Sequence, residues 1–177
     1  REPGGTPLAT AVRELFLHPP EGDRPTADAE LFLISAARSQ HVARVIKPSL
    51  DAGHWVICDR YYDSTRVYQG TLGGVPSANL ENVVSYSVAG CHPELTFLLD
   101  CPVELSLERV AKRAEAEGRP NGNRYDQGTR SMHETLRQAY LDLHRRFPAR
   151  IVRIDASSTP DQVLKQAWSQ LKQHYRL

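Results

Sequence analysis

The sequence predicts an α/β fold in which a parallel β-sheet is flanked by helices. Three short apolar runs, at 55–58, 95–99 and 151–154, are each followed by an acidic residue, as is common where buried parallel strands end. Amphipathic stretches with helical spacing separate these runs, and no hairpin turn joins them. The 177 residues show no internal repeat or linker, so we expect one domain over 1–177.

The first half of the chain is predicted to be mainly helical. Thr6 before Pro7 is a good helix opening, because a hydroxyl can cap free amides and proline suits the first helical position. Pro48 is expected to bend or tighten the end of the second helix. The helices predicted in this half span about 7–17, 26–51, 61–70 and 77–90.

The second half alternates helices with the two remaining strands. Its predicted helices span about 103–117, 128–147 and 160–175. A basic stretch at about 113–126 contains several arginines among glycine and asparagine, a composition that suits a mobile lid closing over phosphates. A solvated surface loop is the plainer interpretation of the same residues.

Composition excludes several classes of function. The formal net charge is +1, so no bulk field attracts nucleic acid or membrane, and phosphate recognition must depend on a few arginines. No apolar run is long enough for a membrane span, and no secretory leader opens the chain. Cys58, Cys91 and Cys101 lack metal-ligand spacing and are interpreted as buried free thiols of a reducing compartment. We therefore expect a cytoplasmic protein without nucleic-acid or membrane partners.

The segment 59–70 carries the richest chemistry. Asp59 and Arg60 follow a predicted strand, and ligands of parallel sheets bind at the carboxyl ends of strands. Arginine offers a planar fork of donors to phosphate, and the neighbouring carboxylate could orient it or join a magnesium shell. Four polar side chains of the following helix can share one face: Ser64, Thr65, Tyr68 and Gln69. A helix cap with a surface ion pair is the alternative interpretation.

Two further arginines are candidates for a binding site. Arg38 lies four residues after Ile34, on the helix face that should be apolar, where a charge is costly unless it is paired or faces a cleft. Snorkelling to solvent is the alternative. Arg1 precedes a proline and two glycines, which suit a tight turn that could point the arginine into a site.

The order of these motifs resembles that of bacterial thymidylate kinases. Arg-Glu-Pro-Gly-Gly-Thr is followed by Glu-Leu-x-Leu-x-x-x-x-Arg-x-Gln-His, by Val-Ile-x-Asp-Arg-Tyr-x-Asp-Ser-x-x-x-Tyr-Gln-Gly, by Leu-Thr-Phe-Leu-Leu-Asp and by Ile-Asp-Ala. The resemblance covers essentially all 177 residues, and 59–70 is its most specific part. It implies a P-loop NTPase-like fold of the nucleoside monophosphate kinases. The implied activity is ATP-dependent phosphorylation of dTMP to dTDP, in the synthesis of dTTP.

The resemblance also implies roles for single residues in binding dTMP. Arg1 and Arg60 would hold its phosphate, and Arg38 would reach the base, which Thr65 and Gln69 would contact. The family usually has an aromatic residue, most often Phe, at the position of Ile34. The thymine ring would therefore lose a stacking partner in this chain, while Phe32, two positions earlier on the helix, should point elsewhere.

The remaining implied roles concern the sugar, the metal and the lid. Tyr68 would lie under the deoxyribose and crowd a 2'-hydroxyl, and Asp59 would help to organise the phosphate and Mg²⁺. The lid would carry the catalytic arginines Arg113, Arg119 and Arg124. The family uses ATP as phosphate donor and usually forms a homodimer.

The loop that binds the phosphates of ATP in this family is missing from the sequence. No Gly-x-x-x-x-Gly-Lys-Ser/Thr occurs, and neither Gly4-Gly5 nor Gly73-Gly74 is followed by a lysine. We expect this first strand–loop–helix unit, on the order of 30 residues, to lie upstream of Arg1, which stands in mid-motif. Two other interpretations stay open: a catalytically inactive nucleotide-binding or scaffold protein, and a kinase for another nucleoside monophosphate.

The 177-residue polypeptide alone is expected to transfer phosphate from ATP to dTMP at no measurable rate, although it should keep some affinity for the monophosphate. Nothing in it can cradle the β- and γ-phosphates, and lid arginines alone cannot position them. A coupled assay of ADP release compares this polypeptide with one extended by the upstream segment, which should restore activity by many orders of magnitude. Robust turnover by the short polypeptide would contradict this prediction.

Overall fold

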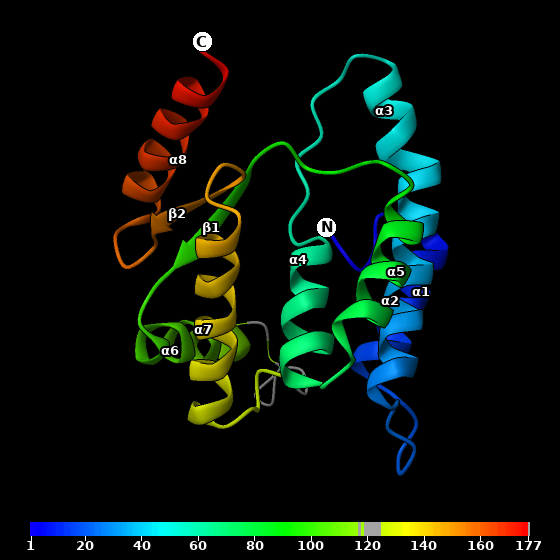
Figure 1. The fold of residues 1–177 in the computed structure, drawn as a ribbon. Coiled ribbons are helices and arrows are strands. Elements are labelled where there is room, and N and C mark those ends of the chain that lie inside the picture. The colour runs from blue at the N-terminus through cyan, green and yellow to red at the C-terminus, as the bar shows by residue number, and fades with distance from the viewer. Residues whose placement is uncertain (117, 119–124, 177) are drawn as a thin grey trace. The chain divides into compact units, whose positions relative to one another are not determined.

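The computed structural model describes residues 1–116, 118 and 125–176 (Figure 1). The chain divides into two compact units, Arg1–His92 and Pro93–Leu177.

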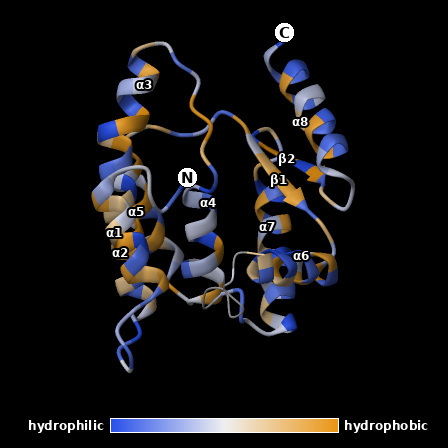
Figure 2. Ribbon diagram, turned by 180° about the vertical axis from the view of Figure 1, so that it is seen from behind, coloured by the Kyte–Doolittle hydropathy of each residue, from blue (hydrophilic) through white to orange (hydrophobic). Residues whose placement is uncertain are grey.

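The first unit is helical. Helices α1 and α5 both pack against α2 (Figure 1), and apolar residues occur along these helices (Figure 2). Apolar side chains of α2 and α5 contribute to the core of the unit. The buried core cluster consists of Leu31, Tyr62, Val75, Leu80, Val84 and Val88. The helices of this unit are α1 (Pro7–Leu17), α2 (Ala27–His41), η1 (Val42–Ile46), α3 (Lys47–Asp51), α4 (Tyr62–Thr65), η2 (Arg66–Leu72) and α5 (Ser77–Val88).

The predicted helix starts are confirmed by their caps. The Thr6 hydroxyl accepts a hydrogen bond from the Ala9 N–H at 3.1 Å, and the Thr26 hydroxyl accepts one from the Ala29 N–H at 3.2 Å. Each bond satisfies an amide that the helix itself leaves free, which stabilises the helix by about 1 kcal/mol. These starts are encoded locally in the sequence.

The helix predicted over 26–51 is continuous. Its later part was expected to bend or tighten at Pro48, but the helix instead has a wider, π-helical turn just before this proline. The π-helical stretch η1 ends at Ile46, two residues before Pro48. Proline cannot donate to the carbonyl four residues earlier and crowds it, which favours a departure from α-helical geometry at this point.

The prediction of a strand at 55–58 was wrong. Trp55 and Ile57 are 63% and 94% exposed, and no strand of the described ranges pairs with this segment. A parallel strand exists only where a neighbour supplies its ladder of hydrogen bonds, so an apolar run alone does not determine it. Just after the run, the Glu2 N–H donates to the Asp59 carbonyl at 2.9 Å, which brings the start of the chain to this point.

The second unit contains the parallel sheet. Strands β1 (Thr96–Asp100) and β2 (Ile151–Asp155) pair in parallel along their whole length. Helix α7 (Arg130–Arg146) packs on both strands, and α8 (Pro160–Tyr175) packs on β2. Helix α6 (Val103–Ala116) packs on α7. The predicted parallel sheet with flanking helices is confirmed, with two strands in the described residues.

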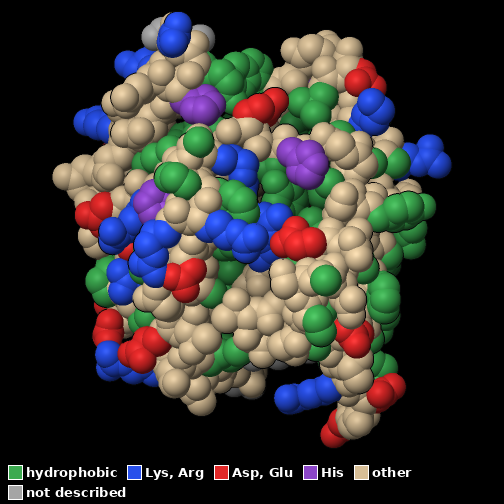
Figure 3. All heavy atoms as spheres, viewed as in Figure 1, with side chains coloured by type: hydrophobic (Ala, Val, Ile, Leu, Met, Phe, Trp, Pro, Cys, Tyr) green, Lys and Arg blue, Asp and Glu red, His purple; other side chains and the backbone are tan. Residues whose placement is uncertain are grey.

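The surface agrees with the small net charge. Figure 3 shows Lys and Arg side chains interspersed with Asp and Glu over the face it views. In the part of the chain that the structure describes, no helix has the length and apolarity of a membrane span. The three cysteines, predicted to be buried free thiols, are free but only partly buried.

Asp100 organises the second unit at the end of β1. Its buried carboxylate accepts hydrogen bonds from Arg137 Nε at 2.7 Å and from Arg153 Nε at 2.8 Å. These bonds, led by that of Arg137, lower the pKa of the Asp100 carboxyl. The Asp100 charge therefore ties the strand to α7 and β2.

Asp100→Asn should lower the free energy of unfolding by about 1–3 kcal/mol, because two arginines lose their counter-charge. Asp142→Asn is the matched control, because Asp142 makes an exposed pair with Arg145. This variant should change the free energy of unfolding by about 0.5 kcal/mol or less. Urea unfolding at pH 7 measures both.

The same two variants also test the pH dependence of stability. A carboxyl with a lowered folded-state pKa contributes its full stability above its ordinary pKa, about 4, and loses it as the pH falls through the folded value. The stability difference between the protein and Asp100→Asn should therefore be constant near neutrality and shrink below about pH 4. Equal effects of the two variants at pH 7 would contradict the role of Asp100.

Candidate functional site

A buried arginine lies at the centre of the first unit. Arg38 on α2 is 1% exposed; its Nε donates to Glu2 Oε2 and its Nη2 to Thr65 Oγ1, both at 2.8 Å. Its guanidinium carbon lies 5.4 Å from the centre of the Tyr61 ring. Of the two alternatives that the sequence left open for Arg38, pairing is the one that the structure adopts.

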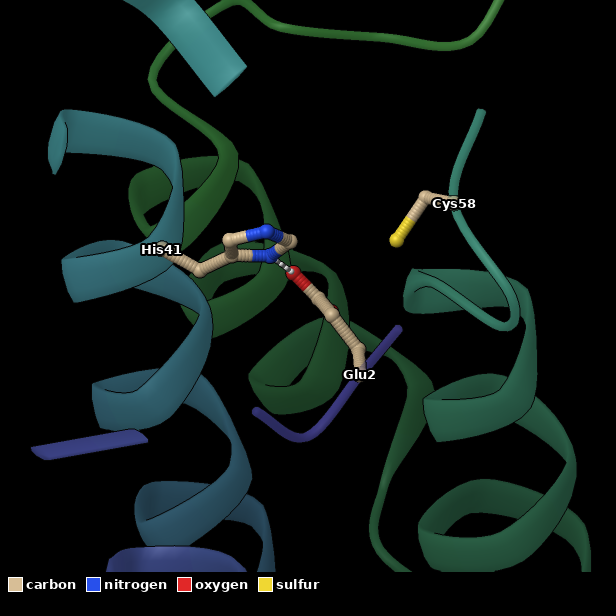
Figure 4. A group of neighbouring side chains, drawn as sticks. All are labelled: Glu2, His41 and Cys58. Carbon is tan, nitrogen blue, oxygen red and sulfur yellow. Dashed lines mark hydrogen bonds and ion pairs between the residues drawn. The ribbon is translucent and has the colours of Figure 1, made fainter. Parts of the chain in front are cut away.

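Glu2 holds this arginine and a histidine at the same time. Its Oε1 lies 3.1 Å from His41 Nδ1 (Figure 4). Its Oε2 accepts the hydrogen bond from Arg38 Nε. Both Glu2 and His41 are buried. Sequence reasoning missed them, although an arginine on an apolar helix face requires a counter-charge. The pattern could not identify which acid supplies it.

The turn at the start of the chain positions Glu2 and His41. A Cβ atom on Gly5 would lie 2.3 Å from His41 Cδ2, so the imidazole occupies space that any side chain at Gly5 would fill. Gly5 also has a φ of +89°, a conformation that favours glycine. Gly5 therefore meets two requirements at this contact, a left-handed backbone and a close approach.

Thr65 and Gln69 lie four residues apart where α4 continues into η2, and both are buried. Gln69 Nε2 donates to Glu30 Oε2 at 2.9 Å. Within the described residues, Arg38 Nη1, Gln69 Oε1 and Ser35 Oγ are buried without a hydrogen-bond partner. Such atoms are costly, so their presence indicates that a ligand or water completes the site.

A second group combines three arginines with Asp59. Arg1 Nε lies 3.9 Å from Asp59 Oδ2, and both side chains are exposed. Arg13 on α1 donates to the Pro3 carbonyl at 3.2 Å. Burial lowers the pKa of Arg13, and repulsion from Arg1 and then Arg60 adds to the effect. Positive charge therefore exceeds negative charge here, as a phosphate site requires; sequence reasoning missed Arg13.

Arg60 has a backbone conformation that is unusual for its residue type. Its φ is +64°, which costs a residue with a Cβ about 1 kcal/mol or more, and such residues concentrate at functional sites. Its guanidinium carbon lies 5.4 Å from the centre of the Tyr68 ring. The structure thus places Arg60 beside Tyr68, two of the residues predicted for the site.

The other predicted residues are less closely connected. Ile34 is buried on α2, and Phe32, 62% exposed, points elsewhere as predicted. Ser64 on α4 is half-buried. Arg113 is exposed on α6 in the second unit, whereas Arg119 and Arg124 lie outside the described residues.

Comparisons with known proteins agree on one family. Residues 1–167 match the family model described as thymidylate kinase. A thymidylate kinase from Syntrophotalea carbinolica is 42% identical over 168 residues, covering 95% of this chain and 77% of the relative. One from Bradyrhizobium diazoefficiens is 43% identical over 172 residues, covering 97% and 74%. The crystal structure of thymidylate kinase from Ehrlichia chaffeensis superposes with a TM-score of 0.71 at 26% identity, covering 97% of this chain and 79% of that one.

Glu2→Gln should lower the free energy of unfolding by about 3–5 kcal/mol, because it leaves the Arg38 charge buried without a carboxylate. Asp51→Asn, which breaks the exposed pair with Lys47, should cost about 0.5 kcal/mol or less. Replacing both partners, by Glu2→Gln with Arg38→Met, should recover much of the loss. The buried pair would lose its assigned role if chemical denaturation gave Glu2→Gln and Asp51→Asn the same stability.

Proposed function

The chain belongs to the thymidylate kinase family, and we propose that Arg38, Thr65 and Gln69 form the face on which its nucleotide substrate binds. The reaction is the ATP-dependent phosphorylation of dTMP to dTDP. The observation that carries the proposal is the state of Arg38. Two of its nitrogens are fixed by Glu2 and Thr65, and the third, Nη1, is buried without a partner in the described residues.

The unsatisfied atoms match the edge of thymine. Arg38 Nη1 is a donor and Gln69 Oε1 is an acceptor, whereas thymine offers a carbonyl oxygen, O4, beside the N3–H donor. Cytosine offers the reverse order, an amino group beside an unprotonated nitrogen. This complementarity supports recognition of a thymine base. The buried Ile34, one turn before Arg38, offers the ring an aliphatic surface in place of an aromatic one.

The phosphate of dTMP would bind to the arginines beside Asp59. Arg1 and Arg60 are the proposed ligands, and the mutual repulsion of Arg1, Arg13 and Arg60 supports adding Arg13, because a phosphate dianion would offset it. Asp59 is exposed and offers a hard oxygen ligand, which suits Mg²⁺ bound through one or two carboxylates and substrate phosphates. Bound Mg²⁺ would neutralise charge on the transferring phosphoryl group.

The sugar would lie between these two ends of the site. Tyr68 is half-buried on η2, and its ring is within cation–π distance of Arg60, so a nucleotide held by Arg60 would pass close to the ring. We propose that the ring crowds a 2'-hydroxyl and thereby favours deoxyribose. Ser64, on the same helical segment, is a further proposed contact.

Further parts of the function are proposals carried by the family alone. Arg113, Arg119 and Arg124 would act from a lid at about 113–126, closing over the phosphates of ATP. The protein would act as a homodimer in the cytoplasm.

The two ends of the proposed site can be tested separately by comparing dTMP with thymidine, which lacks the phosphate. Arg60→Ala should weaken dTMP binding by about 2 kcal/mol or more and leave thymidine binding nearly unchanged, because it removes a phosphate partner alone. Gln69→Leu should weaken both ligands alike, since both carry the base. Isothermal titration calorimetry measures all four affinities.

Arg44→Ala is the matched control, because Arg44 is an exposed arginine on η1 outside the proposed site. It should bind both ligands as the parent protein does. Loss of thymidine affinity in Arg60→Ala, or unchanged dTMP affinity, would remove Arg60 from the phosphate site.

A further inference from the structure

A second group of functional side chains adjoins Arg38 of the proposed nucleotide site. Glu2, His41 and Cys58 each offer one donor atom, and these oxygen, nitrogen and sulfur atoms lie within 4.8 Å of one another. Figure 4 shows the side chains pointing toward one another from three separate segments. Glu2 and His41 are buried, and Cys58 is partly buried. The proposed binding of dTMP uses this group only through Glu2 Oε2, which holds Arg38, and the proposed binding of Mg²⁺ does not use it.

The spacing is close to that of a coordination shell. Metal–ligand bonds of about 2.0–2.3 Å put the ligands of a tetrahedral zinc ion about 3.3–3.8 Å apart. His41 Nδ1 and Glu2 Oε1 are already 3.1 Å apart. Movements of about 1 Å or less would therefore let all three atoms coordinate one ion.

The surrounding contacts fix two of the three ligands. Arg38 binds Oε2 of Glu2, so the second oxygen can serve a metal without loss of the arginine pair. The imidazole of His41 is held against Gly5, where no side chain can displace it. The Glu2 N–H bond to the Asp59 carbonyl keeps the start of the chain beside Cys58.

The donor set selects the kind of metal. Thiolate, imidazole and carboxylate together suit Zn²⁺, whereas Mg²⁺ prefers an all-oxygen shell. A reactive cysteine is the competing explanation of the group. Three donor atoms of three different kinds within 4.8 Å of one another favour a metal, and the zinc measurements described below separate the two explanations.

We propose that Glu2, His41 and Cys58 form a binding site for one Zn²⁺ ion, with the fourth position taken by water. The ion would take the place of the protons on the thiol and between Glu2 and His41. It would tie the start of the chain to α2 and to the segment before Arg60. The ion would bind the Glu2 oxygen that does not bind Arg38, and its ligands do not include Asp59, the proposed ligand of Mg²⁺.

Zinc affinity is measured on purified, tag-free protein by competition with a chromophoric chelator. The parent protein should bind one equivalent, and Cys58→Ala should lose about 100-fold or more in affinity. The matched control is the double variant Cys91→Ala with Cys101→Ala, which leaves Cys58 as the sole thiol and should bind as the parent does. Mg²⁺ should not compete.

Cobalt provides a readout of the ligand itself. Co²⁺ should give a thiolate charge-transfer absorption in the parent and in the double variant but not in Cys58→Ala. Circular dichroism checks that each variant is folded, and Cys58→Ser replaces Cys58→Ala if it is not. Absence of stoichiometric binding by the parent would overturn the proposal. So would an absorption or an affinity that survives loss of Cys58.

Discussion

The ion pair between Glu2 and Arg38 is the constraint on which the first unit depends. Both groups are nearly inaccessible to water, and a buried charge without its partner costs several kcal/mol. The start of the chain, which carries Glu2, must therefore lie against α2 at Arg38. The pair joins residues 36 positions apart, and Thr65 extends the network to α4.

This network orients the donor that we propose for recognition of the nucleotide base. Because Glu2 and Thr65 bind Nε and Nη2, the plane of the guanidinium is fixed, and so are the directions in which Nη1 can donate. Buried polar networks are rigid when every member has a partner, and the unpaired atoms of Arg38 and Gln69 would gain theirs from the proposed ligand. The same carboxylate also faces His41, so the proposed nucleotide site and the proposed zinc site share Glu2 without sharing an oxygen.

The second unit solves a similar electrostatic problem with the charges exchanged. There the buried group is the carboxylate of Asp100, and two partly exposed arginines neutralise it. In both units the buried charged pairs connect elements that are distant in the chain, while the helix caps at Thr6, Thr26, Thr129 and Thr159 are local. Local contacts thus form the elements, and buried charges connect them.

The sequence by itself determined the helices, the strands β1 and β2, the family and most of the proposed binding residues, because caps, periodicity and motif order are written in neighbouring residues. Only the tertiary structure decided that 55–58 is not a strand, since a strand needs a neighbour that the run itself does not specify. It alone decided that Glu2 and His41 belong to the site of Arg38. A buried arginine requires a counter-charge, but which acid provides it is fixed by the path of the chain through space.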